Sequence, residues 1–152
     1  MAKFIYPYQR ILEMKAKEKE QAQLLMAKAL QKQESIESRI SNLMHSISDV
    51  QERLTSKQDA GIPITELRMI ADYVTTLQKR VDLERMDLGF AKKNVDKKQE
   101  VLRDALKEEK TWEILKEKQQ KEFLDVVKLR EQVQLDEISN QVFYRHMEQR
   151  SD

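Results

Sequence analysis

The sequence predicts an all-α protein, a long antiparallel two-helix coiled-coil hairpin with the second helix longer than the first. The 152 residues include only two Gly and two Pro, whereas these two residue types together make up roughly 12% of an average sequence. Sheet folds that turn every few residues are therefore excluded. Ala, Glu, Lys, Leu and Arg make up 70 residues, a composition typical of long helices. Apolar residues also recur in heptads, which is the pattern of a coiled coil.

The first helix is expected at about residues 5–57. Pro7 is compatible with its first turn, where the backbone N–H has no partner inside the helix. Lys15, Glu18 and Lys32 fall on apolar positions of the repeat, which predicts weaker packing in this half. One heptad row contains Tyr8, Ala22, Ala29, Ile36, Leu43 and Val50. The interleaved row contains Phe4, Ile11 and Leu25 and then, after a shift of one residue that changes the winding locally, Ile40, Ile47 and Leu54.

A single turn is expected at about residues 58–64. Gly61 suits the left-handed position just after a helix, and Pro63 follows where a helix cannot continue. Thr65 is then predicted to cap the next helix.

The second helix is expected at about residues 65–148, so that the whole chain forms one domain. Its repeat pairs with the first helix if Leu54 faces Leu67, and Tyr8 then lies near Trp112. Phe4 and Tyr8 are therefore expected to converge on the only Trp and to close the open end of the hairpin. One heptad row contains Leu67, Val74, Val81, Leu88, Val95 and Leu102. The interleaved row contains Ile70, Leu77, Ala91, Ala105 and Trp112, with Glu84 and Lys98 as interruptions.

Two apolar surfaces remain without a partner in this pairing. The beginning of the first helix lies opposite about residue 119, so the second helix has no partner beyond that point. This unpaired part is as apolar as the paired part, whereas solvated single helices are usually polar all round. Its apolar residues are Phe123, Leu124, Val126, Val127, Val133, Leu135, Ile138, Val142 and Phe143. A second stripe contains Met69, Tyr73, Leu83, Met86 and Phe90. Both surfaces predict binding partners, although the first could also self-associate and the second could be scattered surface residues.

Residue chemistry argues against catalysis. The 28 basic and 27 acidic residues leave a net charge of +1, so no strong attraction to nucleic acid or to anionic membrane is expected. Cys is absent, and His45 and His146 lack metal-ligand spacing. No glycine-rich nucleotide motif is present. We therefore expect no enzyme activity, catalytic residue, cofactor or metal, and a cytosolic chain that is at most peripheral to a membrane, because no apolar run could span one.

The order of these features resembles the flagellar export protein FliJ family and its injectisome counterparts. The resemblance rests on the opening Phe4, Tyr8, Ile11 and Leu12, a Lys/Glu-rich helix, the Gly-containing turn, Trp112 with Leu115, Phe123, the run Leu135-Asp136-Glu137-Ile138, and Phe143. It covers the whole chain. Pro7 departs from the opening pattern.

The resemblance implies a protein shaped like the central stalk of a rotary ATPase, at the cytoplasmic face of the cell membrane. Its implied partners are the hexameric export ATPase, the cytosolic domain of the export gate and free substrate chaperones. The residues of this chain that the resemblance implies for binding the ATPase are Phe4, Tyr8, Phe123, Val127, Leu135, Asp136, Glu137, Ile138 and Phe143. Those assigned to the gate are Met69, Tyr73, Leu83, Met86 and Phe90, on exposure rather than on a motif.

Two other classes of protein share the predicted helices. A structural scaffold could self-assemble through the unpaired end of the second helix. A prefoldin-like chaperone would need β-hairpin segments between its helices, and residues 56–65 are too short to supply them.

Overall fold

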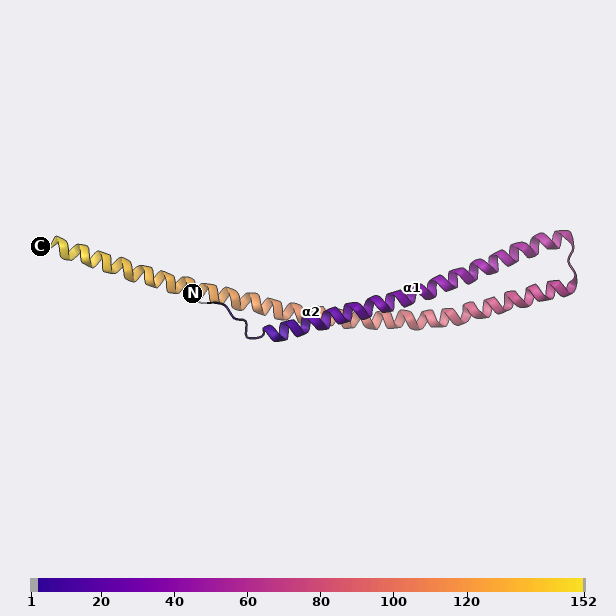
Figure 1. The fold of residues 1–152 in the computed structure, drawn as a ribbon, viewed down its shortest axis with the longest axis horizontal. Helices are drawn as coiled ribbons and strands as arrows, with labels where there is room; N and C mark the ends of the chain where they lie inside the picture. The colour runs from indigo at the N-terminus through magenta and orange to yellow at the C-terminus, as the bar shows by residue number, and fades with distance from the viewer. Residues whose placement is uncertain (1–2, 152) are drawn as a thin grey trace. The chain divides into compact units, whose positions relative to one another are not determined.

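Two helices account for nearly all of the residues that the computed structural model describes, which are residues 3–151 (Figure 1). Helix α1 spans Gln9–Ala60 and helix α2 spans Ile64–Arg150, with 52 and 87 residues. No strand occurs between residues 3 and 151. The two helices pack against each other, so the predicted all-α hairpin with a longer second helix is confirmed.

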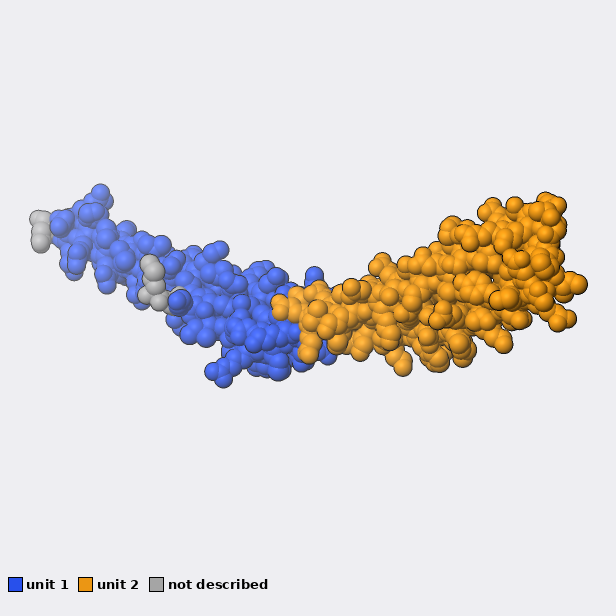
Figure 2. Space-filling view, turned by 45° about the vertical axis from the view of Figure 1, so that its right-hand side comes forward, with its two compact units in different colours: residues 1–18, 106–152 blue, residues 19–105 orange. Residues whose placement is uncertain are grey.

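The chain divides into two compact units (Figure 2). Unit 1 contains Met1–Glu18 and Leu106–Asp152, and unit 2 contains Lys19–Ala105. Each unit therefore holds a part of α1 and a part of α2, and each is described here by itself.

The core of unit 2 follows the predicted heptad rows. Its least exposed side chain is Ile36, at 2%. Every buried apolar residue of this unit was expected in the seam: Ala22, Ala29 and Ile36 on α1, and Leu77, Val81, Ala91, Val95 and Ala105 on α2. The spacing of packed helices depends on the side chains at the contact, so the alanines allow a close approach. The sequence pattern thus identified this core.

Packing within unit 2 differs from the expectation in one respect. Lys32 was expected to weaken the seam around it, but Ala29 and Ile36 on either side are buried while Lys32 is exposed. This expectation was wrong because the lysine lies outside the contact. The looser part is near the turn, where Leu43, Val50, Leu54, Leu67, Ile70 and Val74 are only half-buried.

The turn between the helices contains the predicted left-handed glycine. Gly61 has a φ of 82°, and its N–H donates to the carbonyl of Gln58 at 3.3 Å. The N–H groups of Glu66 and Leu67 both donate to the carbonyl of Pro63, each at 3.1 Å. Thr65 was expected as the cap, but it lies within the first turn of α2, because Pro63 accepts the first helical bonds.

Unit 1 begins with an irregular segment, residues 3–8, which we call the N-terminal segment. The carbonyl of Tyr6 accepts from the N–H of Gln9 at 3.2 Å, and α1 begins there rather than near residue 5. Pro7 therefore belongs to a turn that precedes the helix. Further along, Lys15 occupies a seam position and is satisfied by an ion pair, with its Nζ 2.9 Å from Glu108 Oε2.

The two glycines provide a matched test of this backbone. Gly61→Ala should lower the free energy of unfolding by about 1–2 kcal/mol, the cost of a left-handed residue with a Cβ. Gly89→Ala should raise it by up to about 1 kcal/mol, because Ala is the better helix former. Beyond the adjacent residues and the helix's own backbone, a Cβ at either position would meet no atom within 4 Å, so packing does not interfere. Urea unfolding of both variants checks this, and shifts of the same sign would contradict it.

Candidate partner-binding surfaces

An aromatic cluster joins the N-terminal segment to α2 in unit 1. The ring centroids of Tyr8 and Trp112 lie 5.6 Å apart, and those of Tyr6 and Tyr8 lie 5.8 Å apart. The predicted approach of Tyr8 to Trp112 is confirmed. The cluster closes the paired part of unit 1 with large apolar side chains of few rotamers.

Tyr6 anchors this cluster through both burial and a hydrogen bond. Its side chain is 6% exposed, and its hydroxyl donates to the Trp112 carbonyl at 3.0 Å. Burial, together with the neighbouring Tyr8, raises the pKa of the Tyr6 phenol above its ordinary value. The Nζ of Lys116 lies 6.0 Å from the centre of the Tyr6 ring and 2.9 Å from Gln9 Oε1. Sequence reasoning missed Tyr6, because an irregular segment does not follow the heptad.

Phe4 packs elsewhere than expected. It was expected to converge with Tyr8 on Trp112, but its ring lies 5.6 Å from that of Phe123. The expectation assumed a helix from about residue 5. The chain before Pro7 is irregular, and a non-helical segment spans more distance per residue than a helix. Phe4 therefore reaches a position eleven residues beyond Trp112 on α2.

The end of α2 has no other helix of unit 1 beside it (Figure 1). Every described residue from 128 onwards is exposed. We call residues 124–150 the free end. It carries large apolar side chains that are about half or more exposed: Leu124, Val126, Leu129, Val133, Leu135, Ile138, Val142, Phe143, Tyr144 and Met147.

The structure divides the predicted ATPase residues into two groups. Phe4, Tyr8 and Phe123 belong to the aromatic cluster or its border. The others lie on the free end, where Val127 is half-buried and Leu135, Asp136, Glu137, Ile138 and Phe143 are exposed. Phe143 contacts the ring of Tyr144 at 6.2 Å. The second group is thus open to a partner, whereas the first also holds the N-terminal segment in place.

The predicted gate stripe lies on the surface of unit 2. All five residues are exposed: Met69 at 73%, Tyr73 at 52%, Leu83 at 63%, Met86 at 62% and Phe90 at 66%. Met69 and Tyr73 also line a hollow of about 320 Å³ near the turn, together with Val50, Arg53 and Ile70. Its rim carries the ion pair between Lys57 Nζ and Glu66 Oε1, 3.1 Å apart.

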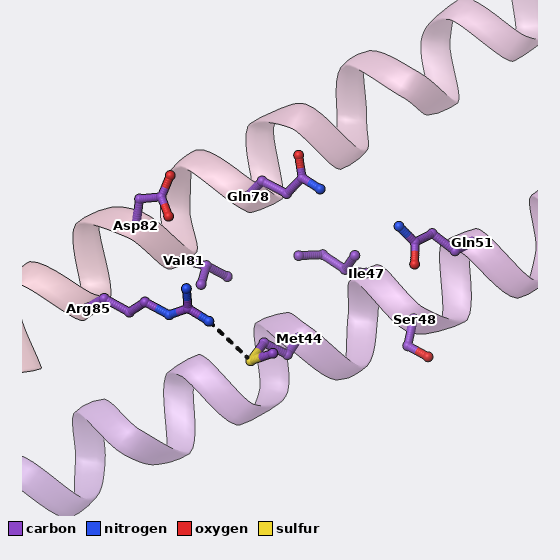
Figure 3. Close-up of a pocket in the computed structure, with 8 residues that line it drawn as sticks. All are labelled: Met44, Ile47, Ser48, Gln51, Gln78, Val81, Asp82 and Arg85. Carbon is purple, nitrogen blue, oxygen red and sulfur yellow. Dashed lines mark hydrogen bonds between the residues drawn. The ribbon is translucent and has the colours of Figure 1, made fainter.

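A second hollow of unit 2 was not identified from the sequence (Figure 3). It has a volume of about 390 Å³ and lies between the two helices. Ile47 and Val81 form its apolar part, and Arg85 reaches Met44, with Nη2 4.0 Å from the sulfur. The remaining lining residues are Ser48, Gln51, Gln78 and Asp82. These groups can donate and accept hydrogen bonds around an apolar floor.

A seam carboxylate of unit 2 has a charged neighbour on the other helix. Arg39 Nη2 lies 3.2 Å from Glu84 Oε2, although the geometry is not that of a hydrogen bond. His45 lies 3.8 Å from Asp49 and is exposed. Within residues 3–151, no three His, Cys, Asp or Glu side chains come together as metal ligands could. In the same range, no helix has a stretch that is both long and apolar enough to cross a bilayer.

The family model described as "Flagellar FliJ protein" matches residues 4–148. The chain belongs to the FliJ family. The "Flagellar FliJ protein" of Bacillus subtilis (strain 168) is 24% identical over 138 residues, which cover 91% of this chain and 94% of that relative. No solved structure matches. Membership of the FliJ family indicates a component of the flagellar export apparatus, and the family is not one of known enzymes.

Proposed function

We propose that this FliJ-family chain is a non-enzymatic rod that binds and stimulates the hexameric export ATPase, in the manner of a central stalk. The observation that carries the proposal is the free end of α2, a single helix whose large apolar side chains are exposed to solvent. Exposed apolar surface of this extent is typical of a binding site. The proposed place of action is the cytoplasmic face of the cell membrane.

Stimulation follows from the asymmetry of such a rod. Six equivalent subunits around one helix cannot all make the same contacts with it. A ligand shifts a conformational equilibrium by its difference in affinity for the two states. The helix would therefore favour one conformation in the subunits that it contacts and another in the rest, which promotes sequential turnover.

Titration of the chain into the export ATPase of the same organism tests the proposal. Turnover should rise and saturate near one chain per six ATPase subunits, because a single helix fills the centre of a ring. Phosphate release measures turnover at each ratio. A flat response at all ratios would remove the proposal.

The gate stripe on unit 2 is proposed to bind the cytosolic domain of the export gate, and the chain is also proposed to bind free substrate chaperones. Tyr73 supports the gate assignment, because it is half-exposed and borders a hollow that a partner side chain can enter. Fluorescence anisotropy with the labelled gate domain tests it. Tyr73→Asp should weaken binding about tenfold, the effect of about 1.4 kcal/mol, and Tyr144→Asp on the free end should not. Equal effects of the two variants would argue against the stripe.

A further inference from the structure

Two hollows of unit 2 lie on the same side of the helix pair. The first is the hollow near the turn that Met69 and Tyr73 line, and the second, of about 370 Å³, lies further from the turn. Positions that recur every seven residues share one side of a helix in a coiled coil. Such positions line both hollows: Arg39, Ser46 and Arg53 on α1, and Glu66, Tyr73 and Arg80 on α2. Leu83 and Phe90 of the gate stripe recur with Met69 in the same way. We call the surface formed by the two hollows the groove.

The groove has an apolar floor and an apolar edge. Leu43, Val50 and Ile70 form the floor and are half-buried. Met69 and Tyr73 form the edge on α2 and are exposed. The hollow on the other side of the helix pair has a polar edge on α2 instead (Figure 3). A groove between two long helices that has apolar residues along its length fits the apolar face of a third helix.

The charged residues that line the groove carry an excess of positive charge. The basic ones are Arg39, Arg53, Lys57 and Arg80, and the acidic ones are Glu66 and Glu84. Both carboxylates already have a basic neighbour on the other helix, since Lys57 lies 3.1 Å from Glu66 and Arg39 lies 3.2 Å from Glu84. Asp49, on the same side of α1, lines neither hollow and lies 3.8 Å from His45.

Two arginines of the groove remain available to a partner. Arg53 and Arg80 are exposed, and neither forms an ion pair with another residue between 3 and 151. A guanidinium group binds a carboxylate through two parallel hydrogen bonds, which favours it for recognition of acidic side chains. The charge of the groove therefore complements an acidic partner.

The spacing of the two arginines fits a helix. In the pairs of Lys57 with Glu66 and of Arg39 with Glu84, the residue numbers add up to 123, so Arg80 lies opposite Leu43. Leu43 precedes Arg53 by ten residues. At 1.5 Å per residue, the two arginines are therefore roughly 15 Å apart along the groove, or about three helical turns. A helix docked along the groove can place one carboxylate at each arginine, because residues about three turns apart share a face.

We propose that the groove binds an amphipathic helix of the cytosolic domain of the export gate, with acidic residues about ten positions apart beside its apolar face. This rests on the proposed function, in which the gate stripe binds that domain, and it extends the site from α2 onto α1. The apolar floor supplies contact area. The two arginines determine the register and orientation of the bound helix, because complementary charges contribute chiefly to specificity and to the rate of association.

Charge reversal in the full-length chain tests this proposal. Arg53→Glu and Arg80→Glu, the groove variants, place acidic groups in the groove. Arg68→Glu is the matched control, because it makes the same change in net charge at an exposed position on the other side of α2. Affinity for the labelled gate domain is measured by fluorescence anisotropy at low and at high ionic strength. At low ionic strength, both groove variants should weaken binding about tenfold and the control should stay within about twofold of the wild type. The difference should shrink at high ionic strength, where salt screens the charges.

Circular dichroism is the control for folding. It should show unchanged helicity in all three variants, because none of the three arginines forms an ion pair within residues 3–151. A photo-crosslinking residue in place of Ser46, which lines the second hollow, gives an independent measurement. It should link to a helical segment of the gate domain that carries acidic residues, and a link to a segment without them would contradict the proposal.

The outcomes distinguish this proposal from the gate assignment on which it rests. Wild-type chain that does not bind the gate domain would overturn both. Weakened binding in Tyr73→Asp with unchanged binding in both groove variants would overturn the acidic helix alone and leave the gate assignment intact. Equal losses in Arg68→Glu and in the groove variants would show an effect of net charge, which would also overturn the acidic helix.

Discussion

A chain truncated after Gln119 should leave the export ATPase at its basal turnover. The truncation removes the free end with its exposed apolar side chains. It also removes Phe123 and with it the contact to Phe4. The contacts that hold the N-terminal segment and α1 to α2 in unit 1 remain, since Tyr6 still reaches the Trp112 carbonyl and Lys15 still pairs with Glu108. We therefore expect a folded helical hairpin that no longer stimulates.

The control for this prediction is the fold of the truncated chain. Circular dichroism should show the same helicity per residue as the full chain, and Trp112 fluorescence should report an unchanged aromatic cluster. Phosphate release is then measured over the ratios that saturate the full chain. Full stimulation by the folded, truncated chain would move the ATPase site away from the free end.

The heptad repeat was enough to predict the core of unit 2, because burial in a helix pair is set by a fixed period. Ile36, Leu77 and Val81 follow directly from that period. The N-terminal segment could not be predicted in this way. Phe4 and Tyr6 lie before the helix, where no period fixes the direction of a side chain. Their contacts with Phe123 and Trp112 depend on the path of an irregular segment.

The candidate surfaces were predictable to a similar degree. The exposure of Tyr73 and Ile138 follows from their positions outside the paired seam. Val126 and Val133 of the free end were also expected, whereas the equally exposed Leu129, Tyr144 and Met147 were not named from the sequence. The hollow around Ile47 and Val81 has no periodic signal, since it depends on how far apart the two helices lie near the turn.

The second large effect is expected at the centre of unit 2. Ile36→Ala should lower the free energy of unfolding by about 3 kcal/mol, within the 2–5 kcal/mol that such truncations cost when the site is buried. Ile36 is 2% exposed, so the side-chain atoms that the substitution removes come from a packed environment. A helix pair has little other core to close around the gap. Small proteins have only about 5–15 kcal/mol of stability in total, so the loss is a large fraction.

Leu24→Ala is the matched control for Ile36→Ala, because both lie on α1 within unit 2 and Leu24 is 56% exposed. Its cost should stay below about 1 kcal/mol, since exposed substitutions away from special contacts have small effects. Urea unfolding followed by circular dichroism measures both. Ala is the best helix former, so helix propensity cannot explain a loss at position 36. Equal losses at the two positions would mean that the heptad seam is not what stabilises unit 2. A large loss at Ile36 alone would show that burial in the seam, rather than position on α1, determines the cost of the substitution.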